Sequence, residues 1–381
     1  MKCRKVVVSF AIFAFSLLLV GSSLQAQSAD SIPRPAKRLI GDYGYWSQTQ
    51  TPPYSSAQIP FQKFTHINHA GVSFDANGVL VVPSGFIEKA LLTKAHNNGV
   101  KVMLLISGDF TDIQGTTGGL AALLANLKVF IVEYGYDGVD IDWEYPESTA
   151  DENFFHSLML GLRTTFPSPY LISADVAPWG GSGYDFPDTK LLVDWFNIMT
   201  YDCAGPWTDS AQLNSAIFPD PNDPESYNCE PGGSVKEAID IYTQQLGIAA
   251  AKLNIGTPFY GYVYHQANAL WGYCPDTNKA GDCGGSVDYE NYGTFFKQRI
   301  NAMGWRTYYD PYSLVPYMLK TDGSEGFITY DDPSSTFYRV WYTDWSRGLG
   351  GTFIWEIDAD YDGTTQDLLD AAYNASLPQT P

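Results

Sequence analysis

Short apolar runs that alternate with helical segments constrain the fold of this 381-residue chain more than any other feature. Eight such runs follow one another along the chain, and each reads as a β-strand. They lie at 38–45, 64–74, 101–107, 138–142, 170–176, 195–200, 253–259 and 351–355. Alternation with helical segments such as 119–134 favours parallel strands. The sequence therefore predicts an α/β protein built as a (β/α)8 barrel over residues 36–375.

One region, 262–325, interrupts this alternation. It is rich in Tyr, Gly, Asp and Cys, and its strands look short. We interpret it as a small α+β insertion domain between the seventh and eighth strands, which would deepen a substrate groove. A decorated loop is the alternative.

The charge balance limits the possible partners. The formal net charge is −20, from 22 basic and 42 acidic residues. Such a surface repels phosphate backbones, so we expect no nucleic-acid partner. The chain also has 26 Tyr, 21 Phe and 10 Trp, which can build a core and also suit the flat apolar faces of neutral sugars.

The N-terminus has the layout of a secretory signal peptide. Lys2, Arg4 and Lys5 precede an apolar run at 6–20, and small and polar residues lead to Ala26. The run is shorter than the roughly 20 residues that span a bilayer. We therefore expect a signal peptide at 1–26 and a secreted protein, extracellular or periplasmic, with no membrane association after cleavage. A retained anchor is the alternative.

Four cysteines follow the leader: Cys203, Cys229, Cys274 and Cys283. Four cysteines allow three pairings. Proximity in sequence favours Cys203–Cys229 and Cys274–Cys283. A zinc site is the alternative, but the chain has no C-x-x-C spacing here and no close histidine.

Residues 136–146 place four acidic side chains in a segment that otherwise reads as a buried strand. Strand alternation directs Asp140, Asp142 and Glu144 to one side. Like charges on one face repel and resist desolvation, which is typical of acid–base chemistry or of a cation site.

The position of this segment favours acid–base chemistry. Active sites of parallel barrels lie at the C-terminal strand ends, so Glu144 should contact substrate, with Asp142 and Asp140 successively deeper. Crowded carboxyls share protons, and one stays protonated as a general acid requires. Calcium or magnesium is the alternative, but Trp143 and Tyr145 are unlike calcium-loop residues. We expect no metal and no other cofactor.

Asp137-x-x-Asp140-x-Asp142-x-Glu144 resembles the D-x-x-D-x-D-x-E signature of family 18 glycoside hydrolases, the chitinases. Three further segments resemble motifs of later strands in this family, in the expected order. They are Met199-Thr200-Tyr201-Asp202 with Gly205-Pro206-Trp207, then Gly256-Thr257-Pro258-Phe259-Tyr260-Gly261, then Gly350-Gly351-Thr352-Phe353-Ile354-Trp355-Glu356. The resemblance covers roughly residues 38–373.

The resemblance implies a role for each matched residue. Glu144 would be the proton donor, Asp142 would orient the substrate's N-acetyl group, Asp140 would share charge with Asp142, and Tyr201 would bind the acetamido group. The expected substrate contacts are Asp202, Met199, Trp355, Trp207, Tyr260 and Tyr43. Asp137 is expected to hold the strand end, and Ser107 to hydrogen-bond to the deep Asp140.

The chain departs from the family pattern at four places. Asp42 follows Gly41 where the family usually has Gly-Tyr, and Gly71 stands where an aromatic residue is frequent. Asp109 replaces a glycine after Ser107-Gly108. Tyr262 follows Tyr260-Gly261 where the family normally has an arginine.

The expected function is that of a secreted, monomeric chitinase that binds and hydrolyses chitin or N-acetylglucosamine oligosaccharides. No nucleophile facing the acidic row is evident, and the resemblance implies that the substrate's own acetamide oxygen takes this role. The alternatives are an endo-β-N-acetylglucosaminidase, a peptidoglycan hydrolase, or a non-catalytic chitin-binding lectin.

Overall fold

Parallel pairing runs around a closed circuit of eight strands in the computed structural model, which describes residues 32–223, 233–274, 283 and 286–378. Around the circuit the order is β1-β14-β8-β7-β6-β5-β4-β2, and pairing of β2 with β1 closes it. The strands are β1 (Arg38–Gly44), β2 (His66–Phe74), β4 (Lys101–Ser107), β5 (Gly138–Asp142), β6 (Leu171–Val176), β7 (Trp195–Ile198), β8 (Leu253–Pro258) and β14 (Gly351–Trp355). The predicted barrel is confirmed, and each strand falls within a predicted run.

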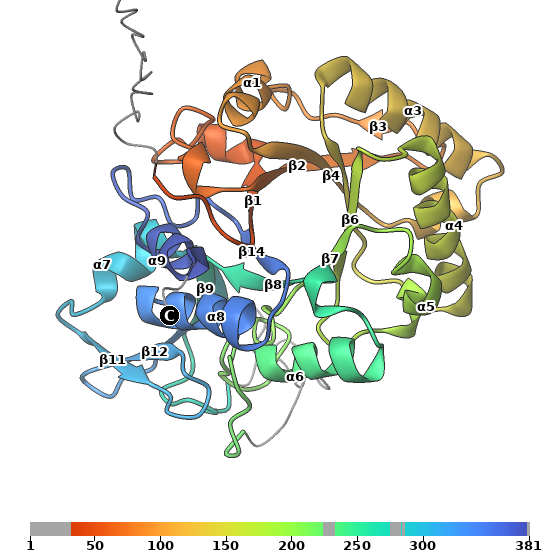
Figure 1. Cartoon of the computed structure of the whole chain (residues 1–381). Helices are drawn as coiled ribbons and strands as arrows, with labels where there is room; N and C mark the ends of the chain where they lie inside the picture. Colours follow the sequence, from red (N-terminus) through yellow and green to blue (C-terminus); the bar gives the residue numbers. More distant parts are fainter. Residues whose placement is uncertain (1–31, 224–232, 275–282, 284–285, 379–381) are drawn as a thin grey trace, which may run out of the picture. The chain divides into compact units, whose positions relative to one another are not determined.

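Helices surround the ring of strands (Figure 1). They are α1 (Lys89–Asn97), α2 (Thr111–Gln114), α3 (Gly119–Tyr134), α4 (Thr149–Thr165), α5 (Phe186–Thr189), α6 (Val235–Asp240), α8 (Pro333–Trp341) and α9 (Asp367–Ser376). A further short helix, α7 (Lys297–Arg299), belongs to the region inserted between β8 and β14. In α3, the residues Leu123, Leu127 and Ile131 recur every four positions and are buried. Helix α4 begins with a capping box in which Ser148 and Asp151 satisfy each other's backbone N–H groups.

Alternation along each barrel strand separates an apolar outer layer from the interior. On β5, Val139 and Ile141 belong to the core beneath the helices, whereas Asp140 hydrogen-bonds across the interior to neighbouring strands. Nearer the N-terminal end, the guanidinium of Arg38 lies 4.9 Å from the ring of Trp195. The polar interior is therefore reached from the C-terminal strand ends.

An antiparallel sheet of order β10-β9-β13-β12-β11 is inserted between β8 and β14. Its strands are β9 (Tyr260–Tyr264), β10 (Val287–Asn291), β11 (Trp305–Tyr309), β12 (Pro316–Lys320) and β13 (Phe327–Thr329). It starts two residues before the predicted boundary, because β9 follows β8 almost directly. It also extends past residue 325, because β13 pairs with β9 to complete the sheet.

A short strand, β3 (Leu80–Val81), pairs antiparallel with the end of β2. No helix of the described residues is both long enough and apolar enough to cross a bilayer. The predicted signal peptide at 1–26 lies outside the described residues, and from Pro33 onward the chain forms one structural unit.

Candidate active site

The acidic row of β5 runs from the barrel interior to its mouth. Asp140 is fully buried, Asp142 is half-buried, and Glu144, just beyond the strand end, is exposed. The side chains thus become more exposed from Asp140 to Glu144, as their positions along the strand predict. The register places Asp140 beside Ser173 of β6 and Asp142 beside Ser107 of β4.

Asp140 accepts hydrogen bonds from side chains of three other strands, β2, β6 and β7. Asn68 Nδ2 donates to Oδ2 at 2.7 Å, Ser173 Oγ donates to Oδ1 at 2.5 Å, and Asn197 Nδ2 lies 3.4 Å from both oxygens. Burial raises the pKa of Asp140 to about 6, against the hydrogen bonds from Ser173, Asp175 and Asn197. The hydroxyl partner of Asp140 is Ser173, so the prediction of Ser107 in that role is wrong: Ser107 lies one step nearer the mouth, beside Asp142.

The pKa of Asp142 lies close to neutral pH. Burial and then the charge of Glu144 raise its pKa to about 7, against a hydrogen bond from Ser107. The Tyr145 hydroxyl hydrogen-bonds to Glu144. A proton on Asp142 beside an exposed Glu144 places a hydrogen-bond donor and an acid–base group next to each other.

Tyr201 and Met199 follow the end of β7 and are buried at the mouth. The Tyr201 ring lies 6.0 Å from Tyr260 and 5.9 Å from Phe353. Position 256 must be glycine, because a Cβ there would come within 2.7 Å of the Tyr201 ring. Burial and then Asp175 raise the pKa of Tyr201 well above its usual value, so its hydroxyl stays protonated.

Two tyrosine hydroxyls of the inserted sheet bind Asp202. Tyr260 and Tyr262 both donate to Oδ1, the latter at 2.8 Å. Burial raises the pKa of Asp202 to about 6, although both hydrogen bonds lower it. Tyr262, which replaces the family's usual arginine, therefore supplies a neutral donor in place of a cation.

Aromatic side chains line the mouth around these polar groups. Trp355 is half-buried, 6.2 Å from Trp46, whose Nε1 donates to Glu356 at 3.2 Å. A Cβ atom at position 71 would lie 3.7 Å from the Trp46 ring. Trp46 therefore fills the space of the aromatic residue that is frequent in the family at the position of Gly71. Trp207 is 43% exposed and packs edge-on against Tyr262 at 5.8 Å.

Two predicted site residues lie away from the mouth. Tyr43 is fully buried, stacks on His69 at 5.5 Å and donates to Glu88 at 2.8 Å. The prediction that Tyr43 contacts substrate is wrong, because alternation on β1 directs Asp42, not Tyr43, into the barrel.

Asp137 precedes β5, at the opposite end of that strand from Glu144. It accepts from Lys101 Nζ at 2.6 Å and from the Val102 amide at 2.9 Å. Burial raises its pKa, but the hydrogen bonds from Lys101, Val102 and His96 together bring that pKa below its usual range. These contacts fit the structural role expected of Asp137.

The sequence interpretation missed the polar residues of other strands that face the interior. They are Asp42, Asn68, Ser173, Asp175 and Asn197. Each is a polar residue of a barrel strand, at the inward parity of that strand. This signal could have found them once the barrel was predicted.

Within the described part of the chain, His156, Asp185 and Asp188 are grouped with ligand atoms within 4.8 Å of one another. His156 Nδ1 already contacts Asp185 at 2.6 Å. The group involves α4 and α5, on the outer side of the barrel, and takes no part in the mouth.

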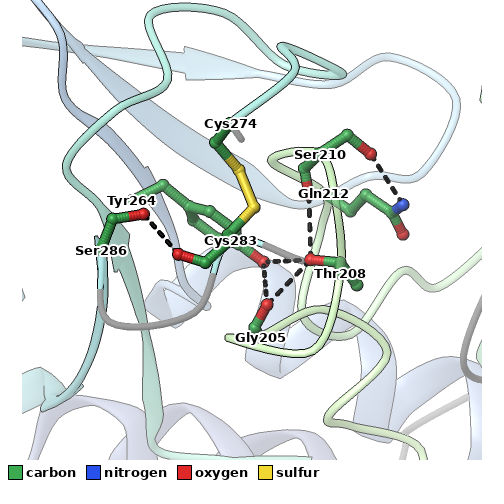
Figure 2. Close-up of a disulfide and its surroundings, with 8 residues drawn as sticks. All are labelled: Gly205, Thr208, Ser210, Gln212, Tyr264, Cys274, Cys283 and Ser286. Carbon is green, nitrogen blue, oxygen red and sulfur yellow. Dashed lines mark hydrogen bonds between the residues drawn. A yellow bond between two sulfur atoms is a disulfide. The ribbon is translucent and has the colours of Figure 1, made fainter. Parts of the chain in front are cut away.

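A disulfide links Cys274 to Cys283, as predicted, beside the loop that carries Trp207 (Figure 2). The Cys283 amide donates to Thr208 O at 2.5 Å and the Cys274 amide donates to Asp209 O at 3.1 Å. Cys203 is also disulfide-bonded, and its predicted partner Cys229 lies outside the described residues. Both cysteines of the bridge, which lie between β9 and β10, are thus hydrogen-bonded to the residues that follow Trp207.

Replacing Cys274 and Cys283 together by serine is expected to lower the free energy of unfolding by about 2 kcal/mol, because the closed loop is short. The loop at Trp207 should also lose its support, so KM for an oligosaccharide should rise while kcat stays near wild type. Urea unfolding and steady-state kinetics check both effects. An unchanged KM in the folded variant would contradict the link between the bridge and Trp207.

The buried carboxyls make a prediction about stability and pH. Several have pKa values above the usual carboxyl range in the folded protein, namely Asp42, Asp142, Asp175, Asp344, Glu356 and Asp360. Unfolding releases their protons, so stability should rise as the pH falls from 8 to 6.5. We expect Tm to rise by about 5 °C over this range.

Below pH 6.5 the effect should weaken, because burial lowers the pKa of His66 to about 4 and that of His69 to about 3. Their unfolded forms then take up protons that the folded forms do not. Replacing Asp344 by Asn, far from the mouth, should reduce the slope of Tm against pH. A Tm that falls between pH 8 and 6.5 would contradict these assignments.

The fold and the site together define a barrel enzyme with a row of carboxyl groups at the C-terminal strand ends. The model of glycosyl hydrolases family 18 matches residues 38–360, and the chain belongs to this family.

Relatives agree with this family. Chitinase A1 of Niallia circulans is 27% identical over 323 residues, 76% of this chain and 44% of that protein, so the chain spans less than half of it. A class V chitinase of Arabidopsis thaliana is 28% identical over 362 residues, 88% of this chain and 90% of that protein. The crystal structure of a Rhizomucor miehei chitinase, 26% identical, superposes with a TM-score of 0.73 over 89% of this chain and 100% of that chain.

Proposed function

We propose that this protein is a chitinase that hydrolyses β-1,4 linkages between N-acetylglucosamine units in chitin and its oligomers. The observation that carries the proposal is the graded row from buried Asp140 through half-buried Asp142 to exposed Glu144. Family membership and the chitinase names of the relatives support the substrate class. Exposed aromatic rings such as Trp207 suit the apolar faces of sugars.

The proposed reaction begins when the proton of Asp142 passes to Glu144, which gives it to the glycosidic oxygen. The acetamide oxygen of the sugar attacks its own anomeric carbon, and an oxazolinium-type intermediate forms. Glu144 then acts as a base on water, which opens the intermediate with retention of configuration. Substrate assistance of this kind needs no second carboxylate across the scissile bond.

Three neighbouring groups would serve the acetamide. Once its proton has passed to Glu144, Asp142 accepts a hydrogen bond from the acetamide nitrogen and stabilises the positive charge that develops there. The Tyr201 hydroxyl, kept protonated by burial, donates to the acetamide oxygen and orients it. Trp355 provides an aromatic floor beneath the sugar that reacts.

We further propose that the protein is secreted, because its N-terminus has the layout of a signal peptide. Comparing the mass of the secreted protein with that of the full chain tests cleavage after Ala26. An uncleaved, membrane-bound chain would contradict it.

An assay panel tests the proposed activity. N-acetylglucosamine oligomers, a high-mannose N-glycan and peptidoglycan are offered to the wild-type protein and to the Glu144→Gln variant. The proposal expects release of reducing ends from the oligomers by the wild type alone. Preferential cleavage of the N-glycan or of peptidoglycan would identify that compound, and not chitin, as the substrate. Binding without cleavage would favour a lectin.

A further inference from the structure

Two carboxyl groups outside the D-x-x-D-x-D-x-E motif flank Asp140 inside the barrel. Asp42 belongs to β1 and Asp175 to β6, and their exposed fractions are 0% and 4%. The mechanism above uses neither of them. Both are nevertheless connected, through one amide each, to Asp140, the innermost carboxyl of the motif.

One amide bridges each flanking acid to Asp140. Asn68 Nδ2 donates to Asp42 Oδ1 at 2.9 Å and to Asp140 Oδ2 at 2.7 Å. On the other side, Asn197 Nδ2 donates to Asp175 at 2.9 Å and lies 3.4 Å from Asp140. The orientation of the Asn197 amide is fixed because its Oδ1 accepts from Asn254 at 2.8 Å.

Asp42, Asp140 and Asp175 are therefore three buried carboxyls held together by two amides. Three like charges this close together and this far from water cannot all be ionised. Asp140 accepts from Asn68 and Ser173, which favours the anion there. The protons therefore belong to Asp42 and Asp175.

The charges around both flanking acids oppose their ionisation. Those that act most on Asp42 are Asp140, Asp142 and Glu356, and those that act most on Asp175 are Asp140, Asp142 and Asp42. All are acidic. Burial first, and then this repulsion, raises the pKa of Asp42 and of Asp175 well above the usual carboxyl range.

We propose that Asp42 and Asp175 are neutral acids that confine the negative charge of the barrel interior to Asp140, and that they thereby act as positioning residues for Asp142. The charge of Asp140 is one of the influences that raise the proton affinity of Asp142. Confinement of that charge keeps Asp142 protonated near neutral pH. The kinetic part of this inference rests on the proposed function, and the protonation part does not.

Infrared difference spectroscopy at pH 7 tests the protonation without any substrate. The spectrum of wild type minus Asp175→Asn should contain the C=O band of a protonated carboxylic acid, and the same holds for Asp42→Asn. The asparagine variants keep the side-chain shape, and their melting curves confirm folding. Loss of a carboxylate band in place of the acid band would overturn the proposal.

The pH dependence of kcat tests the consequence. Asp175→Asn retains a neutral donor to Asp140, so kcat/KM should stay within about threefold of wild type. Asp175→Leu removes the donor, so kcat should fall by about 10- to 100-fold. The acid limb of the pH profile of kcat should also move to higher pH in this variant, because Asp140 loses a hydrogen bond that lowers its pKa.

Equal impairment of the two Asp175 variants, or an acid limb unmoved in Asp175→Leu, would contradict the positioning role. If the wild type cleaves none of the oligomers but both acid bands appear, the protonation is supported and the proposed function fails. The two parts are therefore distinguishable.

Discussion

Replacing Glu144 by Gln is expected to lower kcat for N-acetylglucosamine oligomers by about 10³-fold or more, since the variant has no proton to give the leaving oxygen. Glu144 is exposed at the mouth and carries none of the barrel packing, so Tm should stay within a few degrees of wild type. The expected result is a folded protein that binds oligomers but does not cleave them. Reducing-end release and calorimetric binding measure the two properties.

The same variant has a spectroscopic consequence. Because the charge of Glu144 helps to raise the pKa of Asp142 to about 7, its removal should lower that pKa. Infrared titration of the Asp142 acid band in Glu144→Gln measures the change. Turnover close to wild type in this variant would refute the assignment of Glu144 as the acid.

Replacing Asp142 by Asn should have the second largest effect. The variant cannot carry the charge that stabilises the acetamide nitrogen, so kcat should fall by about 10²- to 10³-fold. KM should change much less, because the aromatic contacts that bind the sugars remain. Steady-state kinetics on a soluble oligomer separates the two parameters.

Asp137→Asn is the matched control, since Asp137 belongs to the same motif but lies at the other end of β5. The variant lacks the negative charge that accepts hydrogen bonds from Lys101 and the Val102 amide, so the free energy of unfolding should fall by about 1–3 kcal/mol. The kcat of the folded fraction should stay near wild type. If Asp137→Asn lost as much kcat as Asp142→Asn, the division of the motif into chemical and structural parts would be wrong.

The barrel and the acidic row could be predicted because both depend on local patterns. Apolar runs give the strands, and alternation on β5 gives the inward face of Asp140 and Asp142. The same reasoning failed for Tyr43, because two tyrosines stand close together at the end of β1 and the sequence does not say which position faces inward. The structure shows that the inward residue is Asp42.

Local sequence patterns could not predict the contacts between segments that lie far apart in the chain. Ser173 rather than Ser107 reaches Asp140 because the register between β5 and β6 decides which residues lie side by side. Tyr262 reaches Asp202, in place of an arginine, only because β9 pairs with β13 in the inserted sheet. Trp46 fills the space at Gly71 from the helical turn that follows β1. Each of these contacts depends on closure of the barrel or assembly of the inserted sheet.

The anomeric configuration of the first product tests the central claim, that the substrate's acetamide is the nucleophile at a site whose acid is Glu144. Proton NMR is recorded within the first minutes of hydrolysis of an N-acetylglucosamine tetramer, before mutarotation. The account predicts that the new reducing end appears as the β-anomer, and that the fully deacetylated tetramer is not cleaved. Initial release of the α-anomer, or equal cleavage of the deacetylated chain, would contradict it.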